Sequence, residues 1–146
     1  MNVSNSNIYK NARLRSGLKR DPAAEELHID VRTLDKYESL DGRPPQEVVR
    51  KMCDLYGNKF LAWQHIKRSP LGDILPDLNE YTFQGATLNV VNDFNSVNDI
   101  LKEIVDIAAD GKVSSDEQPI WQKNKARLLK LTGSLISLLL SDKEGE

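Results

Sequence analysis

Five short stretches in the first half of the chain repeat apolar residues at the three-to-four-residue spacing of a helix that buries one face. Capping and turn-forming residues separate them, because Gly17 follows the first, Asp30 precedes the third and Gly57 ends the fourth. Pro44 and Pro45 stand where the fourth begins. The stretches run from Ile8 to Ser16, Arg20 to Leu27, Val31 to Glu38, Gln46 to Tyr56 and Lys59 to Lys67. Short helices in this number predict a compact bundle.

Two longer helical patterns occupy the second half. The first, from Leu88 to Ala109, spaces its apolar residues alternately four and three apart, which indicates a narrow heptad-like stripe. The stripe consists of Val90, Phe94, Val97, Leu101, Ile104 and Ala108. The second pattern, from Glu117 to Leu140, has a wider apolar face, and Ser114 or Ser115 is placed to cap its start.

The wide apolar face of the second long helix exceeds what the narrow stripe of the first can cover. A second copy of the chain is the simplest cover, and two paired hairpins would form a four-helix dimer interface. Packing on the linker and front domain of the same monomer is the alternative. The residues expected in the dimer interface are Trp121, Leu128, Leu131, Leu135 and Leu138.

Helical spacing is lost between the two halves, where prolines and glycines interrupt the chain from Ser69 to about Gln84. No stretch alternates apolar and polar residues as a strand would. We therefore predict an all-α chain: a five-helix domain at residues 1–69, a linker at 70–84, and a long C-terminal helical hairpin at 85–146.

The two halves differ in charge. Residues 1–69 hold 13 Lys and Arg against 9 Asp and Glu, a net charge of +4, whereas residues 70–146 hold 7 against 13, a net charge of −6. A basic front half is suited to binding phosphates, and an acidic rear half to facing protein or solvent.

Composition excludes several classes of protein. With 39% hydrophobic and 29% charged residues the chain is typical of soluble globular proteins, its first residues are polar, and no apolar run approaches the roughly 20 residues of a membrane span. We expect a cytoplasmic protein with no membrane partner. The single Cys53, with only His28 and His65 beside it, gives no metal-ligand spacing. Because no nucleophile motif, phosphate-cradling glycine loop or acid-base pair is present, we expect no enzyme, no cofactor and no small-molecule ligand.

Residues 17–45 combine a short helix, a tight turn and a capped helix. Ala23 and Ala24 allow the two helices to cross closely, since a bulky side chain at the crossing would push them apart. The expected shared core consists of Leu27, Ile29, Leu34 and Tyr37.

This segment resembles the lambda-repressor/Cro-like (XRE) family of helix-turn-helix regulators, over about 60 residues. The family order is an Arg in helix 1, Gly-Leu before helix 2, Ala within it, a capped recognition helix ending Tyr-Glu, and then Pro. Here these residues are Arg13, Gly17, Leu18, Ala24, Asp30, Tyr37, Glu38 and Pro44. Two positions depart from the pattern: His28 stands where the turn usually has Gly, and Pro22 lies in the first turn of helix 2.

The resemblance implies a transcription regulator that binds double-stranded DNA as a homodimer without a cofactor. The whole arrangement, with its C-terminal hairpin, is similar to regulators carried by phages and mobile elements of bacteria. The resemblance also implies that Arg13 pairs with Glu38 as a structural bridge, and that Arg20 contacts the DNA backbone.

Helical periodicity selects the candidate DNA-reading side chains. With Leu34 and Tyr37 facing inward, four residues of the same helix must face outward. These candidate base contacts are Val31, Arg32, Asp35 and Lys36. Arg32 has the planar fork that matches guanine O6 and N7, and Val31 can touch a thymine methyl group. The candidate phosphate contacts are Lys19, Arg20 and Thr33.

Other functions remain open at this point. The helix-turn-helix could be vestigial, in an antitoxin-like or adaptor protein whose acidic half binds a protein partner, or it could serve a replication or recombination protein. A calcium loop is a further alternative, because residues at its positions one, five, six, eight and twelve are Asp106, Asp110, Gly111, Val113 and Glu117. Its third position is Ala108, however, so a helical corner turned by Asp-Gly is favoured over calcium.

Overall fold

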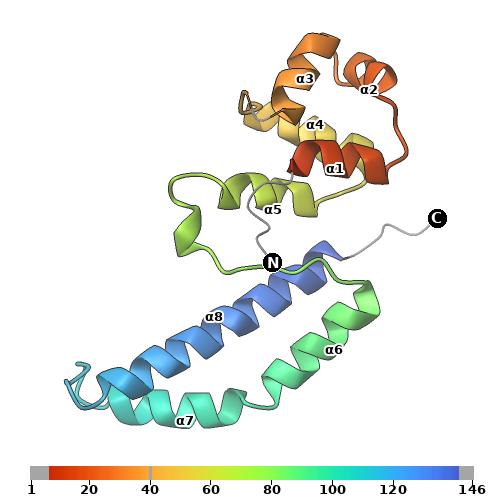
Figure 1. The fold of residues 1–146 in the computed structure, drawn as a ribbon. Helices are drawn as coiled ribbons and strands as arrows, with labels where there is room; N and C mark the ends of the chain where they lie inside the picture. Colours follow the sequence, from red (N-terminus) through yellow and green to blue (C-terminus); the bar gives the residue numbers. More distant parts are fainter. Residues whose placement is uncertain (1–6, 40, 142–146) are drawn as a thin grey trace. The chain divides into compact units, whose positions relative to one another are not determined.

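The computed structural model describes residues 7–39 and 41–141, and within these ranges all regular structure is helical, as predicted (Figure 1). Contacts divide the chain after Ile74, inside the segment for which we predicted a linker. The first unit contains α1 (Ile8–Arg15), α2 (Arg20–Glu26), α3 (Val31–Glu38), α4 (Gln46–Tyr56), α5 (Phe60–Lys67) and the 3-10 turn η1 (Gly72–Ile74). The second contains α6 (Phe83–Phe94), α7 (Val97–Ala108) and α8 (Gln118–Leu140).

The helices of the first unit begin and end within one residue of their predicted limits. Their apolar faces meet in one core, in which α1 packs against α3, α4 and α5 while α2 packs against α3. Ala23 and Ala24 are completely buried, in agreement with a close helix crossing. Cys53 is also a buried core residue.

Local capping explains some of these boundaries and fails at one where it was predicted. Gly57 ends α4 in the left-handed conformation, with φ 60°, which a residue without a Cβ adopts at no steric cost. Asn7 caps α1, since its Oδ1 accepts a hydrogen bond from the Lys10 N–H at 2.9 Å. Asp30 occupies the N-cap position of α3 but makes no side-chain capping bond, so the predicted carboxylate cap is wrong.

The prediction of one uninterrupted helix from Leu88 to Ala109 is wrong. The chain is helical already from Phe83, because Thr82 caps α6 by accepting a hydrogen bond from the Gly85 N–H, and it breaks at Asn95 and Ser96. Ser96 causes the break locally: both its N–H and its Oγ donate to the Asp93 carbonyl, so the i−4 bond of a regular helix is replaced.

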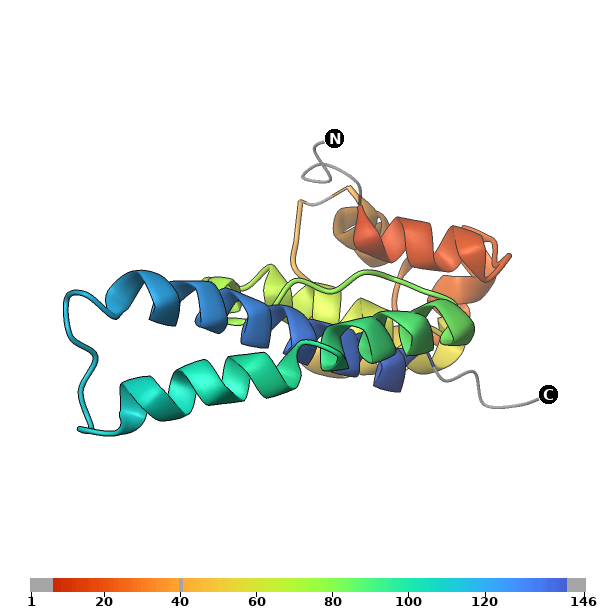
Figure 2. The same ribbon diagram turned by 90° about the horizontal axis from the view of Figure 1, so that it is seen from below.

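The second unit is built on α8, which contacts both α6 and α7 (Figures 1 and 2). Small and polar residues form its buried positions, Asn124, Gly133 and Ser137. At Gly133 an added Cβ would lie 2.6 Å from the Asp77 carbonyl oxygen, so the segment before α6 approaches the α8 backbone closely. None of the described helices is long and apolar enough to cross a membrane.

The heptad-like stripe predicted for the first long helix is only partly buried, since Val90, Val97 and Ile104 are half-buried and its other three members are exposed. Phe94, Leu101 and Ala108 are exposed, whereas Ala86, Ile100 and Ile107 are buried. A polar contact fixes which side of α7 faces α8. The completely buried Asn124 of α8 donates a hydrogen bond to Glu103 Oε2 of α7 at 2.7 Å. Pairing of these two groups turns the Glu103 side of α7 toward α8 and leaves Leu101 outside.

Asp93 joins α6 to α8 through two short hydrogen bonds, from Lys130 Nζ at 2.7 Å and from Ser134 Oγ at 2.6 Å. Burial acts to raise the pKa of Asp93, but the hydrogen bonds from Lys130 and Ser134 and the charge of Lys130 outweigh it, so the pKa lies below its ordinary value. Its stabilising contribution is therefore present above the pKa of an unfolded Asp and is lost as pH falls through the folded pKa.

We expect Asp93→Asn to lower the free energy of unfolding by about 1–3 kcal/mol, since Asn keeps the shape but not the charge-assisted hydrogen bonds. Urea denaturation at pH 7, followed by far-ultraviolet circular dichroism, measures this loss, and the variant should lose less stability than the parent on acidification. Asp99→Asn, at an exposed position of α7, is the matched control. Equal losses in the two variants would contradict the assignment.

Candidate nucleic-acid interface

The turn between α2 and α3 sets the angle at which α3 leaves the bundle. α2 ends in a Schellman motif, in which the Ile29 N–H bonds the Ala24 carbonyl at 3.0 Å, and His28 takes the left-handed conformation with φ 56°. Histidine thus fills the glycine-like turn position noted in the sequence. Leu27 beneath the turn is completely buried, which anchors the turn to the core.

The faces of α3 separate as helical periodicity requires. Leu34 is completely buried and Glu38 is buried, whereas Arg32 and Lys36 are exposed. The other three candidate DNA contacts of this helix, Val31, Thr33 and Asp35, are half-buried. Arg32 and Lys36 therefore project furthest from the core, one helical turn apart.

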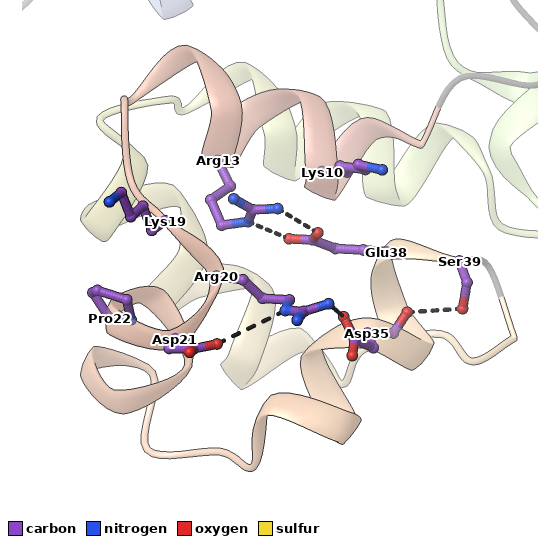
Figure 3. Close-up of a pocket in the computed structure, with 9 residues that line it drawn as sticks. All are labelled: Lys10, Arg13, Lys19, Arg20, Asp21, Pro22, Asp35, Glu38 and Ser39. Atoms are coloured by element: carbon purple, nitrogen blue, oxygen red, sulfur yellow. Dashed lines mark hydrogen bonds and ion pairs between the residues drawn. The ribbon is translucent and has the colours of Figure 1, made fainter.

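Glu38 fastens the end of α3 to α1 through a buried ion pair with Arg13 (Figure 3). Arg13 Nε and Nη2 donate to Oε1 and Oε2 at 2.6 and 2.7 Å, a fork-to-carboxylate geometry, and Nη1 donates to the Leu18 carbonyl at 2.9 Å. The resemblance implied a structural pair at these two positions. The bidentate contact holds α3 at one rotation relative to α1.

Tyr56 of α4 lies in the electrostatic field of this ion pair. Burial raises the pKa of Tyr56 to about 12, and the negative charge of Glu38 adds to the rise. The phenol is therefore neutral at neutral pH, where the ion pair is charged.

Arg20 and Asp35 are brought together across the helix-turn-helix, at 2.9 Å between Arg20 Nη1 and Asp35 Oδ1 (Figure 3). The sequence assigned one to a phosphate and the other to a base, and did not foresee that they pair. Arg20 also lies 3.8 Å from the Asp21 carboxylate. Both side chains of the pair remain about half exposed, 51% for Arg20 and 44% for Asp35, so neither is withdrawn from a ligand.

An open pocket of about 610 Å³ adjoins this pair between α1, α2 and α3 (Figure 3). Three exposed cations, Lys10, Lys19 and Arg20, stand around it, with the Arg13–Glu38 pair at its base. Spaced cations on an open surface are suited to the oxygens of a phosphate backbone. Lys10 belongs to this group although we did not predict it, since its position in α1 gave no signal of proximity to α2.

Residues 10–63 match the family model described as helix-turn-helix. The match begins in α1 and ends in α5, so it contains the turn, α3 and the Arg13–Glu38 pair. It supports DNA-binding transcription regulation of the XRE-like kind for this part of the chain. No curated protein and no solved structure matches the chain significantly.

Two further contacts hold the first unit together behind this surface. The Tyr9 hydroxyl lies 2.8 Å from His65 Nδ1 in the core, and Arg43 donates to the His65 carbonyl at 2.8 Å. Burial, and then the charge of Arg43, lower the pKa of His65. His65 is accordingly a packing residue that links α1 to α5.

The loop between α7 and α8 uses the acidic groups of the calcium-like pattern for its own hydrogen bonds. Asp110 Oδ1 accepts from the Lys112 N–H at 3.0 Å, and Glu117 Oε2 accepts from both the N–H and the Oγ of Ser114. Gly111 makes the turn with φ 75°. Within the described ranges no cluster of three or more His, Cys, Asp or Glu side chains is arranged to hold a metal ion.

We expect Glu38→Ala to cost about 3–5 kcal/mol of the free energy of unfolding, because it leaves the buried Arg13 guanidinium without a carboxylate. Chemical denaturation measures the loss, with the exposed Glu25→Ala as the matched control. The double variant Arg13→Met/Glu38→Leu, which removes both charges, should recover much of the loss. A single variant as stable as the control would show that the ion pair does not hold α3.

Proposed function

We propose that the protein is a sequence-specific transcription regulator that reads double-stranded DNA with α3. The observation that carries the proposal is the exposed position of Arg32 and Lys36 on a helix anchored by buried Leu34 and Glu38, inside a segment that matches a helix-turn-helix family model. An α-helix fits the major groove, where each base pair offers a distinct pattern of donors and acceptors.

The outward face of α3 offers a different chemistry at each position. Arg32 pairs with guanine O6 and N7, Val31 contacts a thymine methyl group, and Lys36 donates to an acceptor on a neighbouring base. Asp35 accepts from a cytosine amino group through a carboxylate that Arg20 orients at 2.9 Å.

Lys19, Arg20 and Thr33 hold the DNA backbone on either side of α3. Arg20 both binds a phosphate and orients the Asp35 carboxylate, because its guanidinium has five N–H donors and Asp35 occupies only part of them. A phosphate bound beside Asp35 would thus be linked through Arg20 to the base-reading surface. Lys10 joins this backbone-binding group on the strength of its place at the pocket.

The second unit serves dimerisation in this proposal. Helix-turn-helix dimers contact two half-sites about 34 Å apart, one turn of DNA, so a dimer would bind a palindrome. Of the five α8 residues predicted for the interface, Trp121, Leu128, Leu131 and Leu138 are half-buried, and Leu135 is exposed at 37%. A chain of this arrangement would act on a nearby promoter, as regulators of phages and mobile elements do.

Selection of random duplex DNA on the purified full-length protein, at low and at physiological salt, tests the proposal. Specific binding should persist at the higher salt and enrich a palindrome, since counterion release weakens non-specific binding first. Salt-sensitive binding without enrichment would overturn sequence reading and favour an adaptor whose second unit binds another protein.

Substitutions should separate base reading from backbone binding. We expect Arg32→Ala to weaken binding to the selected site by about 1–3 kcal/mol and to relax selectivity at one base pair. Arg20→Ala should weaken binding to all sequences through the lost phosphate contact, and should in addition lower selectivity at the base that Asp35 reads, because Arg20 orients that carboxylate. Fluorescence anisotropy on matched and mutated sites measures both effects, and Lys51→Ala, an exposed cation of α4, controls for lost charge. Unchanged selectivity in Arg32→Ala would contradict this orientation of α3.

A further inference from the structure

The second unit carries an exposed apolar stripe on α6 and α7. Its members and their exposed fractions are Leu88 at 65%, Val91 at 52%, Phe94 at 51%, Leu101 at 49% and Val105 at 66%. Within each helix they recur at spacings of three or four residues, so three of them share one exposed side of α6 and two share one exposed side of α7. We call these five residues the outer stripe.

The outer stripe lies on the side of α6 and α7 that does not pack against α8. Ala86, Ile100 and Ile107 fill the inner side and are buried against the rest of the unit. Exposed apolar residues gathered in this way mark a protein interaction surface, since single scattered ones are ordinary but contiguous ones are not. The α8 leucines are poorer candidates because most of them are already half-buried within the unit.

The charges beside the outer stripe favour a second copy of the chain. Asp93 is the only charged residue of α6, and it is bonded to Lys130 and Ser134 of α8. On α7 a shallow groove is lined by Leu101 and Val105 and flanked by Lys102 and Asp106. The groove thus has one positive and one negative charge, four residues apart on the same helix.

A two-fold axis crossing α7 between these charges makes the groove complementary to itself. In an isologous contact each residue meets its counterpart in reverse order, so Lys102 faces the partner's Asp106 and Asp106 faces the partner's Lys102. Leu101 and Val105 then cover the same residues of the other copy. A partner with charges of only one sign would attract one of Lys102 and Asp106 and repel the other.

We infer that the outer stripe is the homodimer interface, with α7 paired antiparallel to α7 of a second copy. The inference deepens the proposed function, on which it rests, by moving the dimer contact from the leucines of α8 to the exposed face of α6 and α7. Two recognition helices are brought into one particle by this contact.

Sedimentation equilibrium of the full-length protein tests the inference across the micromolar range. The parent chain should be a dimer, and Val105→Glu should raise the dimer Kd by at least about 100-fold, because it places an unpaired carboxylate in the apolar contact. Leu139→Glu is the matched control, since Leu139 of α8 is 74% exposed and lies outside the stripe. Far-ultraviolet circular dichroism verifies that the variants fold. A monomeric parent chain, or a Val105→Glu protein that remains dimeric, would overturn the inference.

Charge reversal gives a second, independent readout. Lys102→Asp and Asp106→Lys should each raise the dimer Kd by about tenfold, because each places like charges opposite one another, and the double variant should restore the parent value. Failure of the double variant to recover would overturn the antiparallel pairing. DNA binding is scored separately: a dimer that enriches no sequence refutes sequence reading and leaves the interface standing, whereas a sequence-selective monomer refutes dimerisation and leaves base reading by α3 standing.

Discussion

The position of α3 depends on the buried ion pair between Arg13 and Glu38. Two charges removed from water are stabilising only when each is fully bonded, and here the guanidinium uses three nitrogens, two on the carboxylate and one on the Leu18 carbonyl. This requirement leaves little freedom for the rotation of α3 about its axis. The exposure of Arg32 and Lys36 follows from it, since the side of α3 that carries Glu38 must face α1.

The second unit is organised by polar contacts as well. Asn124 with Glu103 and Asp93 with Lys130 and Ser134 place α7 and α6 against α8. Small buried residues such as Gly133 let the chain approach α8 closely. Because these groups occupy the inner side, many of the larger apolar residues of α6 and α7 are turned outward, which is how a small helical unit comes to have so much uncovered apolar surface.

The sequence predicted the first unit well and the second less well, for physical reasons. Helix limits in the first unit follow from local signals such as Gly57, and the pairing of Arg13 with Glu38 follows from a shared motif. The Asn95–Ser96 break and the contact between Asn124 and Glu103 have no such signal in apolar periodicity. Apolar periodicity treats every apolar residue alike. It therefore gives no sign that the buried amide of Asn124 on α8 turns the side of α7 that carries Glu103 toward α8.

The pairing of Arg20 with Asp35 has a consequence for the time a regulator spends on DNA other than its operator. A cation that already has a carboxylate partner attracts an arbitrary phosphate less strongly than a free one does, because the pair presents little net charge at a distance. Only a DNA site that offers a donor to Asp35 while a phosphate binds the remaining N–H groups of Arg20 uses both members of the pair. In the proposed complex, the Arg20–Asp35 pair thus increases the time that the protein spends on its operator relative to the time that it spends on other DNA.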